Sequence, residues 1–340
     1  MTARDQDLQA FVERAGLGAA RITPLAGDAS TRRYDRLVQP DGMRAVLMDA
    51  PPAKGNDIRP FVRIAAYLAG IGLSAPRIYA QDDKLGFLLL EDLGDDLFAR
   101  ILEQEPHREE TLYETAIDAL VHLHRAPPPA LASYDAATLA SLTAPAFDWY
   151  QFGIAGEIDK NARAAFSELF LRHLAPLDAQ PKVLIQRDYH AENLLWLPDR
   201  EGLARVGLLD FQDAVLGHTA YDLVSLLQDA RRDVSPELEE HMIAHFLEQS
   251  PQDHTAFTTA YAVLGAQRNL RILGVFARLC LRYGKAHYID LIPRVWGHVQ
   301  TNLRHPALAD VAEHIHQSLS PPTPEALSLL RSKCATFPDQ

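Results

Sequence analysis

Cysteine and basic residues are both scarce in this chain of 340 residues. It has only two cysteines, Cys280 and Cys334, which lie far apart in the sequence. This usage argues against a disulfide framework and against a zinc site built on thiolates. Lys and Arg total 33 against 45 Asp and Glu, which gives a formal net charge of -12. The acidic balance argues against the electrostatic footprint of a protein that binds nucleic acids or membranes, so we expect neither partner.

Long apolar runs are also missing from the sequence. No stretch of about 18 apolar residues, the length that a membrane-spanning helix needs, occurs anywhere in it. Residues 1–16 carry acidic side chains and no apolar run of the kind that signal peptides contain. We therefore expect a cytoplasmic protein, and nothing in the sequence indicates an obligate protein partner. The 47% apolar composition and the length allow a folded core divided between about two domains or lobes.

Strand-like patterns are concentrated near the N-terminus. A short helix is expected over residues 5–15, and three strands are expected within residues 21–49, where apolar residues alternate around turn signals. Residues 57–71 have apolar side chains at helical spacing, and two further strand-like runs lie within residues 75–93. These patterns predict a small N-terminal lobe, residues 1–92, with an antiparallel sheet of about five strands and a packing helix.

After residue 93 the apolar spacing is mainly helical. The exceptions are short strand-like runs within residues 183–210, two of which, 194–196 and 206–209, have the pattern of a hairpin. We therefore predict a larger, mostly helical lobe, residues 93–340, and an α+β fold for the whole chain. The predicted helices of this lobe are residues 95–105, 108–125, 159–174, 219–230, 236–249, 253–283 and 306–318.

The stretch from residue 183 to residue 210 carries the strongest chemical signal. Asp188 lies on a polar loop after an apolar run, Asn193 follows five residues later, and Asp210 ends a later apolar run. Phosphoryl transfer needs a carboxylate that accepts the proton of the acceptor hydroxyl, and oxygen ligands for Mg²⁺ bound to the phosphates. Asp188 can supply the first, and Asn193 and Asp210 can supply the second. Each alone would be an ordinary loop or strand-end residue, but their joint spacing predicts a phosphotransferase site.

Two segments of the sequence resemble a known superfamily. QRDYHAENLLW (186–196) and GLLDFQDAVLGHTAYDLVSLL (207–227) are similar to the catalytic and metal-binding segments of the aminoglycoside phosphotransferase/choline kinase superfamily. The resemblance implies a two-lobed protein-kinase-like fold that uses ATP and Mg²⁺. It also implies Asp188 as the catalytic base, Asn193 and Asp210 as metal ligands, and Asp222 as a residue that braces the catalytic loop.

Other segments resemble one branch of that superfamily. LAGDASTRRYDRL (25–37), LLLEDLGDDLF (88–98) and QRNLRILGVFARL (267–279) are similar to segments of bacterial kinases that phosphorylate N-acetylmuramate and N-acetylglucosamine at the anomeric hydroxyl. The resemblance implies an amino sugar kinase of peptidoglycan recycling. Two alternatives stay open at this point. One is a kinase of another small hydroxyl compound, such as an aminoglycoside or an amino alcohol, and the other is a nucleotide-binding pseudokinase.

The nucleotide side is predicted from position in the N-terminal lobe. A turn between two strands contains small and hydroxylated residues that suit a phosphate-covering loop, although a plain hairpin turn would use the same residues. Residues 88–93 fit the hinge between the two lobes. There the backbone groups of Glu91 and Leu93 would pair with the adenine edge. The predicted cofactor-binding residues are Gly27, Ser30, Thr31, Arg32, Arg33, Met48, Glu91 and Leu93.

Met48 marks a departure from the family pattern. Kinases of this fold carry a lysine on the third strand that contacts the α- and β-phosphates, and Met48 stands at the corresponding position. We expect another cation to substitute, with Arg32, Arg33 and Lys54 as candidates. Loss of activity, as in a pseudokinase, is the alternative.

The acceptor side is predicted from a cluster of arginines. The segment from Gln267 to Arg282 repeats arginine at about helical spacing, and arginine forks bind carboxylates. Such a cluster suits an anionic acceptor better than a cationic aminoglycoside or choline, although a solvated helix face or ion pairs would give the same pattern. The predicted substrate-binding residues are His190, Arg268, Asn269, Arg271 and Arg278.

Overall fold

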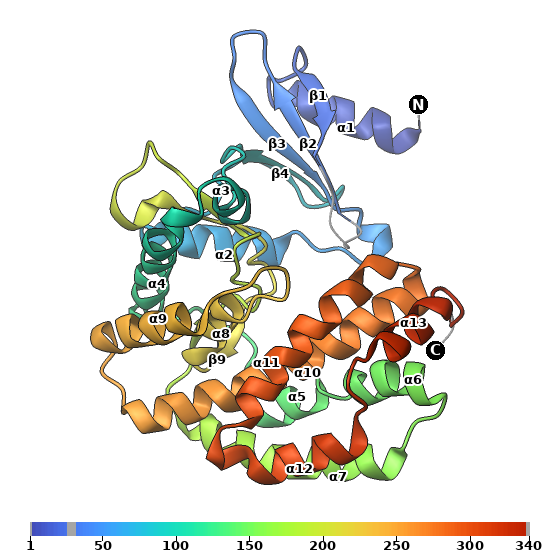
Figure 1. The fold of residues 1–340 in the computed structure, drawn as a ribbon. Coiled ribbons are helices and arrows are strands. Elements are labelled where there is room, and N and C mark those ends of the chain that lie inside the picture. Colours follow the sequence, from blue (N-terminus) through green and yellow to red (C-terminus); the bar gives the residue numbers. More distant parts are fainter. Residues whose placement is uncertain (1, 26–31, 338–340) are drawn as a thin grey trace. The chain divides into compact units, whose positions relative to one another are not determined.

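The computed structural model describes residues 2–25 and 32–337, which Figure 1 draws as a ribbon. The chain forms two compact units. The first comprises Met1–Pro129 and Ala191–Ala214, and the second comprises Ala130–His190 and Val215–Gln340. The chain therefore passes between the units inside the stretch that carries the predicted reaction chemistry. No described helix combines the length and the hydrophobicity of a bilayer-spanning segment.

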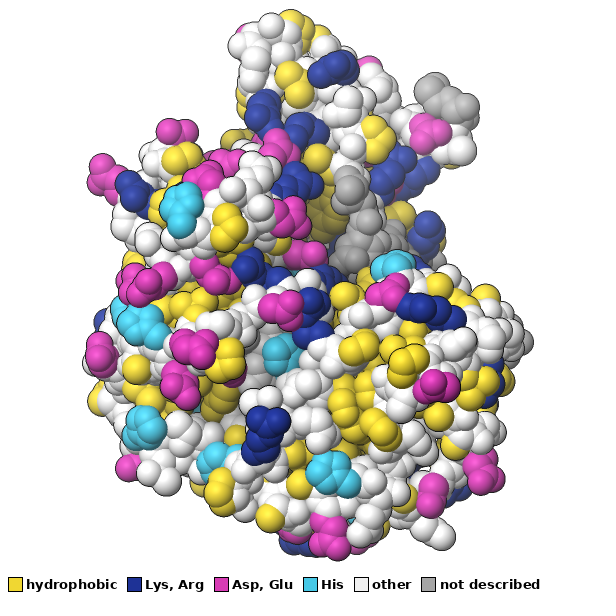
Figure 2. All heavy atoms as spheres, in the orientation of Figure 1, with side chains coloured by type: hydrophobic (Ala, Val, Ile, Leu, Met, Phe, Trp, Pro, Cys, Tyr) yellow, Lys and Arg dark blue, Asp and Glu magenta, His cyan; other side chains and the backbone are white. Residues whose placement is uncertain are grey.

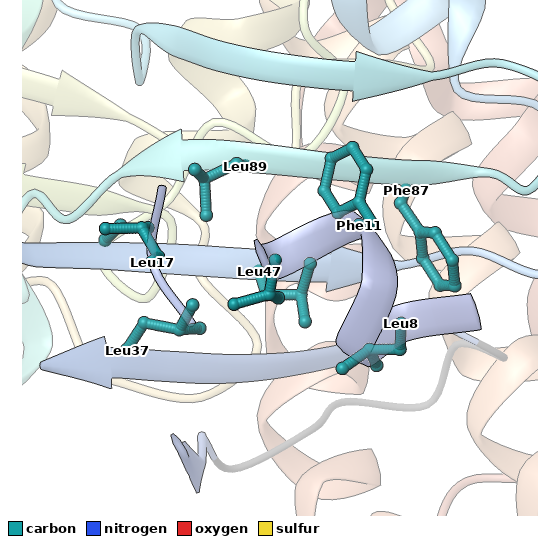
Figure 3. Packing of buried hydrophobic residues seen from close by; sticks show 9 residues of the cluster. Leu8, Phe11, Leu17, Leu37, Leu47, Phe87 and Leu89 are labelled. Atoms are coloured by element: carbon teal, nitrogen blue, oxygen red, sulfur yellow. The ribbon is translucent and has the colours of Figure 1, made fainter. Parts of the chain in front are cut away.

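The first unit is built on an antiparallel sheet of five strands in the order β1-β2-β3-β5-β4. Helix α1 (Ala3–Arg14) starts at a capping box in which Thr2 and Asp5 exchange hydrogen bonds, and it packs on one face of the sheet. Figure 3 shows the core between them, where Phe11 of the helix meets Leu47 and Phe87 of the strands. The strands are β1 (Arg21–Pro24), β2 (Arg33–Val38), β3 (Arg44–Asp49), β4 (Ile78–Asp82) and β5 (Phe87–Glu91).

The rest of the first unit joins helices to a hairpin from later in the chain. The hairpin consists of β7 (Leu194–Trp196) and β8 (Val206–Leu208). The Leu208 N–H donates to the Ser74 carbonyl over 2.8 Å, and the Trp196 N–H donates to the Asp96 carbonyl over 2.8 Å. The further helical elements of this unit are η1 (Pro52–Lys54), α2 (Arg59–Gly70), α3 (Phe98–Gln104), η2 (Pro106–Arg108), α4 (Glu109–Arg125) and η5 (Gly202–Arg205).

The predicted lobe boundary after residue 92 stays a prediction, and residues on both sides of it belong to the first unit. Segments on both sides of that boundary, at Ser74 and at Leu97, form β-bridges with the same hairpin, at Gly207 and at Leu195. Backbone hydrogen bonds from the hairpin also reach Ser74 and Asp96, on either side of that position. The first unit therefore extends to Pro129.

The second unit is mostly helical and is organised around α10 (His254–Tyr283), a helix of 30 residues. All residues from Tyr261 to Leu270 of this helix are buried. Gly274 allows a close approach, because a Cβ there would overlap the backbone of Pro145 and Ala146. The short strands β6 (Val183–Ile185) and β9 (Val215–Gly217) pair antiparallel within this unit.

Further helical elements surround α10 in the second unit. Figure 1 shows several of them, including α8, α11 and α13, by label. They are α5 (Ala136–Ser141), η3 (Ala146–Gln151), α6 (Phe152–Ala155), α7 (Lys160–Leu174), η4 (Ala175–Ala179), α8 (Ala220–Leu227), α9 (Pro236–Gln249), η6 (Ala286–Leu291), α11 (Ile292–Leu303), η7 (Pro306–Leu308), α12 (Ala309–Ser318) and α13 (Pro324–Ser332). The predicted α+β fold, with an antiparallel sheet followed by a mostly helical remainder, is confirmed.

Charged side chains cover the surface in mixed groups. Figure 2 shows Lys and Arg side chains interspersed with Asp and Glu on the face that it draws. One group in the first unit joins Arg36 and Arg44 to Asp92 and Asp95 by ion pairs of 2.8 to 3.4 Å. The charges therefore serve partly as links between segments that are distant in sequence.

Candidate active site

The β7–β8 hairpin brings Asn193 and Asp210 to the same end of a two-stranded sheet. Leu194 pairs with Leu208, so the residues just outside the pair, Asn193 and Leu209, lie opposite each other. The Leu209 N–H donates to the Asn193 carbonyl over 3.0 Å. Asp210 follows directly, with a φ of 55° in the left-handed region that few residues other than glycine adopt. The hairpin thus places the backbones of Asn193 and Asp210 at the same end of its two strands, and their role as metal ligands stays a prediction.

The segment after β8 is anchored inside the first unit. Phe211 is fully buried and its ring lies 4.8 Å from the ring of Phe61 on α2. The side-chain amide of Gln212 donates to Asp210 Oδ1 over 2.7 Å. The left-handed conformation of Asp210 costs on the order of 1 kcal/mol or more. These contacts offset that cost and hold the residue in place.

The loop that carries Asp188 is fixed within the second unit by a buried carboxylate. Asp222, in the first turn of α8, is fully buried and accepts the N–H groups of Gln186 at 2.6 Å and Arg187 at 2.8 Å. Arg187 has a φ of 74°, so the chain turns through the left-handed region one residue before Asp188. Burial raises the pKa of Asp222 to about 7, although the two N–H donors favour the ionised form. Asp222 therefore has the bracing position that the resemblance implied.

Aromatic and basic side chains of the second unit gather near Asp188. The guanidinium of Arg187 lies 5.4 Å from the centre of the Tyr134 ring, which meets Tyr221 edge-on at 5.5 Å. Burial raises the pKa of the Tyr221 hydroxyl. Asp188, Arg268 and Arg271 all act electrostatically on this hydroxyl. The carboxylate of Asp188 thus shares its surroundings with cations of α10.

The four predicted acceptor residues on α10 have different environments. Arg268 is buried and donates to Ser225 Oγ over 2.7 Å, whereas Arg271 is partly exposed. Asn269 is fully buried, and its amide donates to Gln228 Oε1 at 2.7 Å and to the Gly265 carbonyl at 2.9 Å. This placement of Asn269 favours a role in packing. Arg278 lies two helical turns beyond Arg271.

His190, the fifth predicted acceptor residue, lies in the interior of the second unit. Burial lowers the pKa of His190, and Asp229, Arg231, Arg268 and Asp188 act on it electrostatically. At neutral pH its imidazole is therefore uncharged and can serve as a hydrogen-bond donor or acceptor, but not as a cation.

The sheet of the first unit positions the side chains of the predicted nucleotide side. Met48 is buried on β3, and it pairs with Tyr34 on β2 and with Leu88 on β5. Arg33 points to the other face by strand alternation, and its Nε donates to Asp35 Oδ2 over 2.8 Å. Lys54 lies exposed in η1. The predicted Gly27, Ser30 and Thr31 lie outside the described residues.

Arg32 differs from Arg33 in its surroundings. Burial raises the pKa of Tyr34, Arg32 lowers it and Asp210 raises it, so both charged groups lie near the Tyr34 hydroxyl. Residues two apart on an extended chain share a face, and directly paired residues of adjacent strands also share one. Arg32 and Tyr34 therefore lie on the same side of the sheet as Met48.

The predicted hinge is held by ion pairs that the sequence did not reveal. Glu91 accepts a hydrogen bond from Arg200 over 2.6 Å at the end of β5. Arg36 donates to the carboxylates of Asp92 and Asp95 and to the Gly94 carbonyl at 2.9 to 3.2 Å. These contacts flank Leu93 on both sides.

The fold is similar to those of two solved phosphotransferases that act on small molecules. A choline kinase from Streptococcus pneumoniae matches with a TM-score of 0.60 at 13% identity, covering 88% of this chain and 100% of that one. An aminoglycoside-3'-phosphotransferase of type VIII matches with a TM-score of 0.55 at 15% identity, covering 78% of this chain and 100% of that one. These likenesses show that the chain has a protein-kinase-like fold.

The chain belongs to the phosphotransferase enzyme family, whose family model matches residues 21–258. A relative from Caulobacter vibrioides is 40% identical, over 91% of this chain and 94% of the relative, and is named N-acetylmuramate/N-acetylglucosamine kinase. A relative of the same name from Pseudomonas aeruginosa is 35% identical, over 86% of this chain and 87% of the relative. The prediction of a phosphotransferase is confirmed.

The raised pKa of Asp222 predicts a pH-dependent stability. The folded state holds the Asp222 proton more tightly than an unfolded chain with a pKa near 3.8 does. The contribution of Asp222 to the free energy of unfolding is therefore greatest below pH 4 and is lost as the pH rises through about 7. In urea titrations, wild type should lose stability relative to Asp222→Asn between pH 4 and pH 7. Parallel pH profiles would contradict this, and the exposed Asp199→Asn serves as control.

Proposed function

We propose that the protein transfers the γ-phosphoryl group of ATP to the anomeric hydroxyl of N-acetylmuramate, N-acetylglucosamine or both. The observation that carries the proposal is the 40% identity to a kinase of that name along 91% of this chain. The reaction would return cell-wall sugars toward nucleotide-sugar synthesis in peptidoglycan recycling. A cytoplasmic location fits this role, because ATP is the phosphoryl donor.

In this proposal Asp188 is the catalytic base. Its carboxylate accepts the proton of the sugar hydroxyl as the oxygen attacks the γ-phosphorus in line with the departing ADP oxygen. Asp222 supports this role by fixing the two peptide groups before Asp188. Asn193 and Asp210 would hold Mg²⁺, which neutralises charge on the phosphates when it is bound. The shared hairpin end of these two residues supports that assignment.

Replacing Asp188 tests the base. We expect Asp188→Asn to lower turnover by about 10² to 10⁴ while leaving ATP affinity close to that of wild type, because the amide cannot take the proton. Turnover is measured by coupled ADP release and binding by calorimetry. Asp199→Asn is the matched control, since Asp199 is exposed in the turn after β7. Near-normal turnover of Asp188→Asn would rule out the proposed role.

Arg32 is the best-supported replacement for the missing strand lysine. It lies on the same face of the sheet as Met48 and near Tyr34 and Asp210. Arg33 points away and pairs with Asp35, and Lys54 lies in a separate exposed turn. A guanidinium at Arg32 would bind phosphate oxygens through charge-assisted hydrogen bonds.

The two adjacent arginines form a matched pair for testing this role. We expect Arg32→Ala to raise the KM for ATP about tenfold or more, the effect of losing one charge-assisted phosphate contact. Arg33→Ala should change that KM by less than about threefold, because its partner Asp35 lies on the other face of the sheet. Steady-state kinetics at saturating sugar measures both. Equal effects, or a larger effect of Arg33→Ala, would overturn the assignment.

The acceptor is proposed to bind beside the arginines of α10. Arg271 shares the surroundings of Asp188 and is partly exposed, so it is the strongest candidate for a contact with the lactyl carboxylate of N-acetylmuramate. Arg268 lies deeper and would support the site through Ser225 and Tyr221. His190 would contact the sugar as a neutral group, and Arg278 would contribute only at the edge of the site.

A panel of acceptors tests the proposed substrate. Coupled ADP release should be fast with N-acetylmuramate and N-acetylglucosamine, and slow with kanamycin and choline. The product should no longer behave as a reducing sugar, because the anomeric oxygen carries the phosphate. Turnover of kanamycin or choline alone would favour the alternative small-molecule kinase. Retained ATP binding without turnover of any acceptor would favour a pseudokinase.

Arg271 should distinguish the two amino sugars. We expect Arg271→Gln to reduce kcat/KM for N-acetylmuramate about tenfold and that for N-acetylglucosamine by less than about threefold, because only the first has a carboxylate. Arg282→Gln, which removes a guanidinium stacked on Tyr283 at the far end of α10, is the control. Equal losses for both sugars would indicate a structural role for Arg271.

A further inference from the structure

The two cysteines of the chain meet in the second unit. Cys280 lies in the last turn of α10 and is fully buried, and Cys334 follows α13 and is partly buried. Their sulfur atoms are 2.6 Å apart although 54 residues separate them along the chain. The Cys334 Sγ also lies 3.1 Å from the Cys280 carbonyl oxygen. Such proximity does not follow from composition, since two cysteines among 340 residues rarely meet by chance.

The backbone holds the second sulfur in place independently of sulfur chemistry. The Ala335 N–H donates to the Cys280 carbonyl over 3.0 Å, and the Phe337 N–H donates to the Leu281 carbonyl over 3.1 Å. The Phe337 ring meets Phe152 edge-on at 5.1 Å. Residues 334–337, here called the C-terminal latch, therefore donate hydrogen bonds to backbone carbonyls in the last turn of α10.

We propose that Cys280 and Cys334 form a reversible disulfide that fastens the C-terminal latch to α10. With hydrogen peroxide as oxidant, the Cys334 sulfur attacks one peroxide oxygen, giving a sulfenic acid and water. The Cys280 sulfur then attacks the Cys334 sulfur, and the hydroxyl leaves as a second water. Two thiols lose two electrons and two protons, and the peroxide bond is reduced to two waters. A thiol reductant such as dithiothreitol reverses the link by exchange.

The environments of the two sulfurs support this order of events. Burial raises the pKa of Cys280 to about 12, and the Cys334 sulfur beside it adds to the shift. Cys280 is therefore poorly reactive on its own. Cys334 is the more accessible sulfur, so it meets the oxidant first and Cys280 resolves the intermediate. The disulfide would close a loop of more than fifty residues, which restricts the unfolded chain and stabilises the folded one.

The experiment compares peroxide-treated and reduced full-length protein. After treatment and denaturation, we expect loss of both titratable thiols, a cross-linked peptide pair that contains Cys280 and Cys334, and recovery of both thiols with dithiothreitol. The oxidised protein should melt at least roughly 2 °C higher than the reduced protein. Cys334→Ser should abolish the cross-link and the shift in Tm, while its own Tm stays close to that of reduced wild type.

Several outcomes would overturn the proposal. Two free thiols after treatment, a sulfinic acid on Cys334 with Cys280 unmodified, or links only between different molecules would each contradict an internal disulfide. An unchanged Tm with the cross-link present would contradict the latch. If Cys334→Ser does not fold, Cys334→Ala with the same thiol count and peptide map gives the same decision. Failure of these tests leaves the proposed kinase reaction unaffected, because neither cysteine belongs to its site.

Discussion

The loop that bears Asp188 depends on one buried carboxylate. Asp222 lies in a helix whose residues are all buried, and an ionised group there is costly unless donors surround it. The N–H groups of Gln186 and Arg187 offset part of this cost, and their hydrogen bonds to the carboxylate hold a turn in which Arg187 has a left-handed backbone. The two hydrogen bonds offset part of the desolvation of Asp222 and of the strain at Arg187, and they form only when the loop has this conformation. The proposed role of Asp188 as a base would depend on such a fixed loop.

Asp210, in the first unit, also has a left-handed backbone that neighbouring contacts hold in place. Its left-handed backbone would relax if the following residues were mobile, but Phe211 is fixed in the core by Phe61, and Gln212 holds the carboxylate. In both units a strained residue lies next to a group that packing or hydrogen bonds make immobile. Strain of this kind is typical of functional sites, and here it falls on Asp210 and directly before Asp188.

Sequence patterns predicted the fold class and the reaction better than the details of the site. Asp188, Asn193 and Asp210 lie close together in the sequence. The short strands and the hairpin that carry them can therefore be predicted from local patterns. The environment of Asn269 was not predictable, because helical spacing assumes one solvated face and this part of α10 is buried on all sides. The pairing of Arg36 with Asp92, and of Cys280 with Cys334, joins residues more than fifty positions apart and has no local signal.

The proposed role of Arg32 depends on its place relative to Met48, which stands where kinases of this fold have a lysine. Tyr34 and Met48 are directly paired, and Arg32 lies two residues before Tyr34 on the same face. The long side chain of Arg32, just before β2, could therefore reach the region that a lysine on β3 would occupy. Met48 at that position of β3 is buried in the core. A guanidinium also offers two parallel donors where an ammonium offers a point charge. Under this proposal the cation comes from the residue before β2 instead of from β3, and the predicted set of Asp188, Asn193 and Asp210 is compatible with an active kinase.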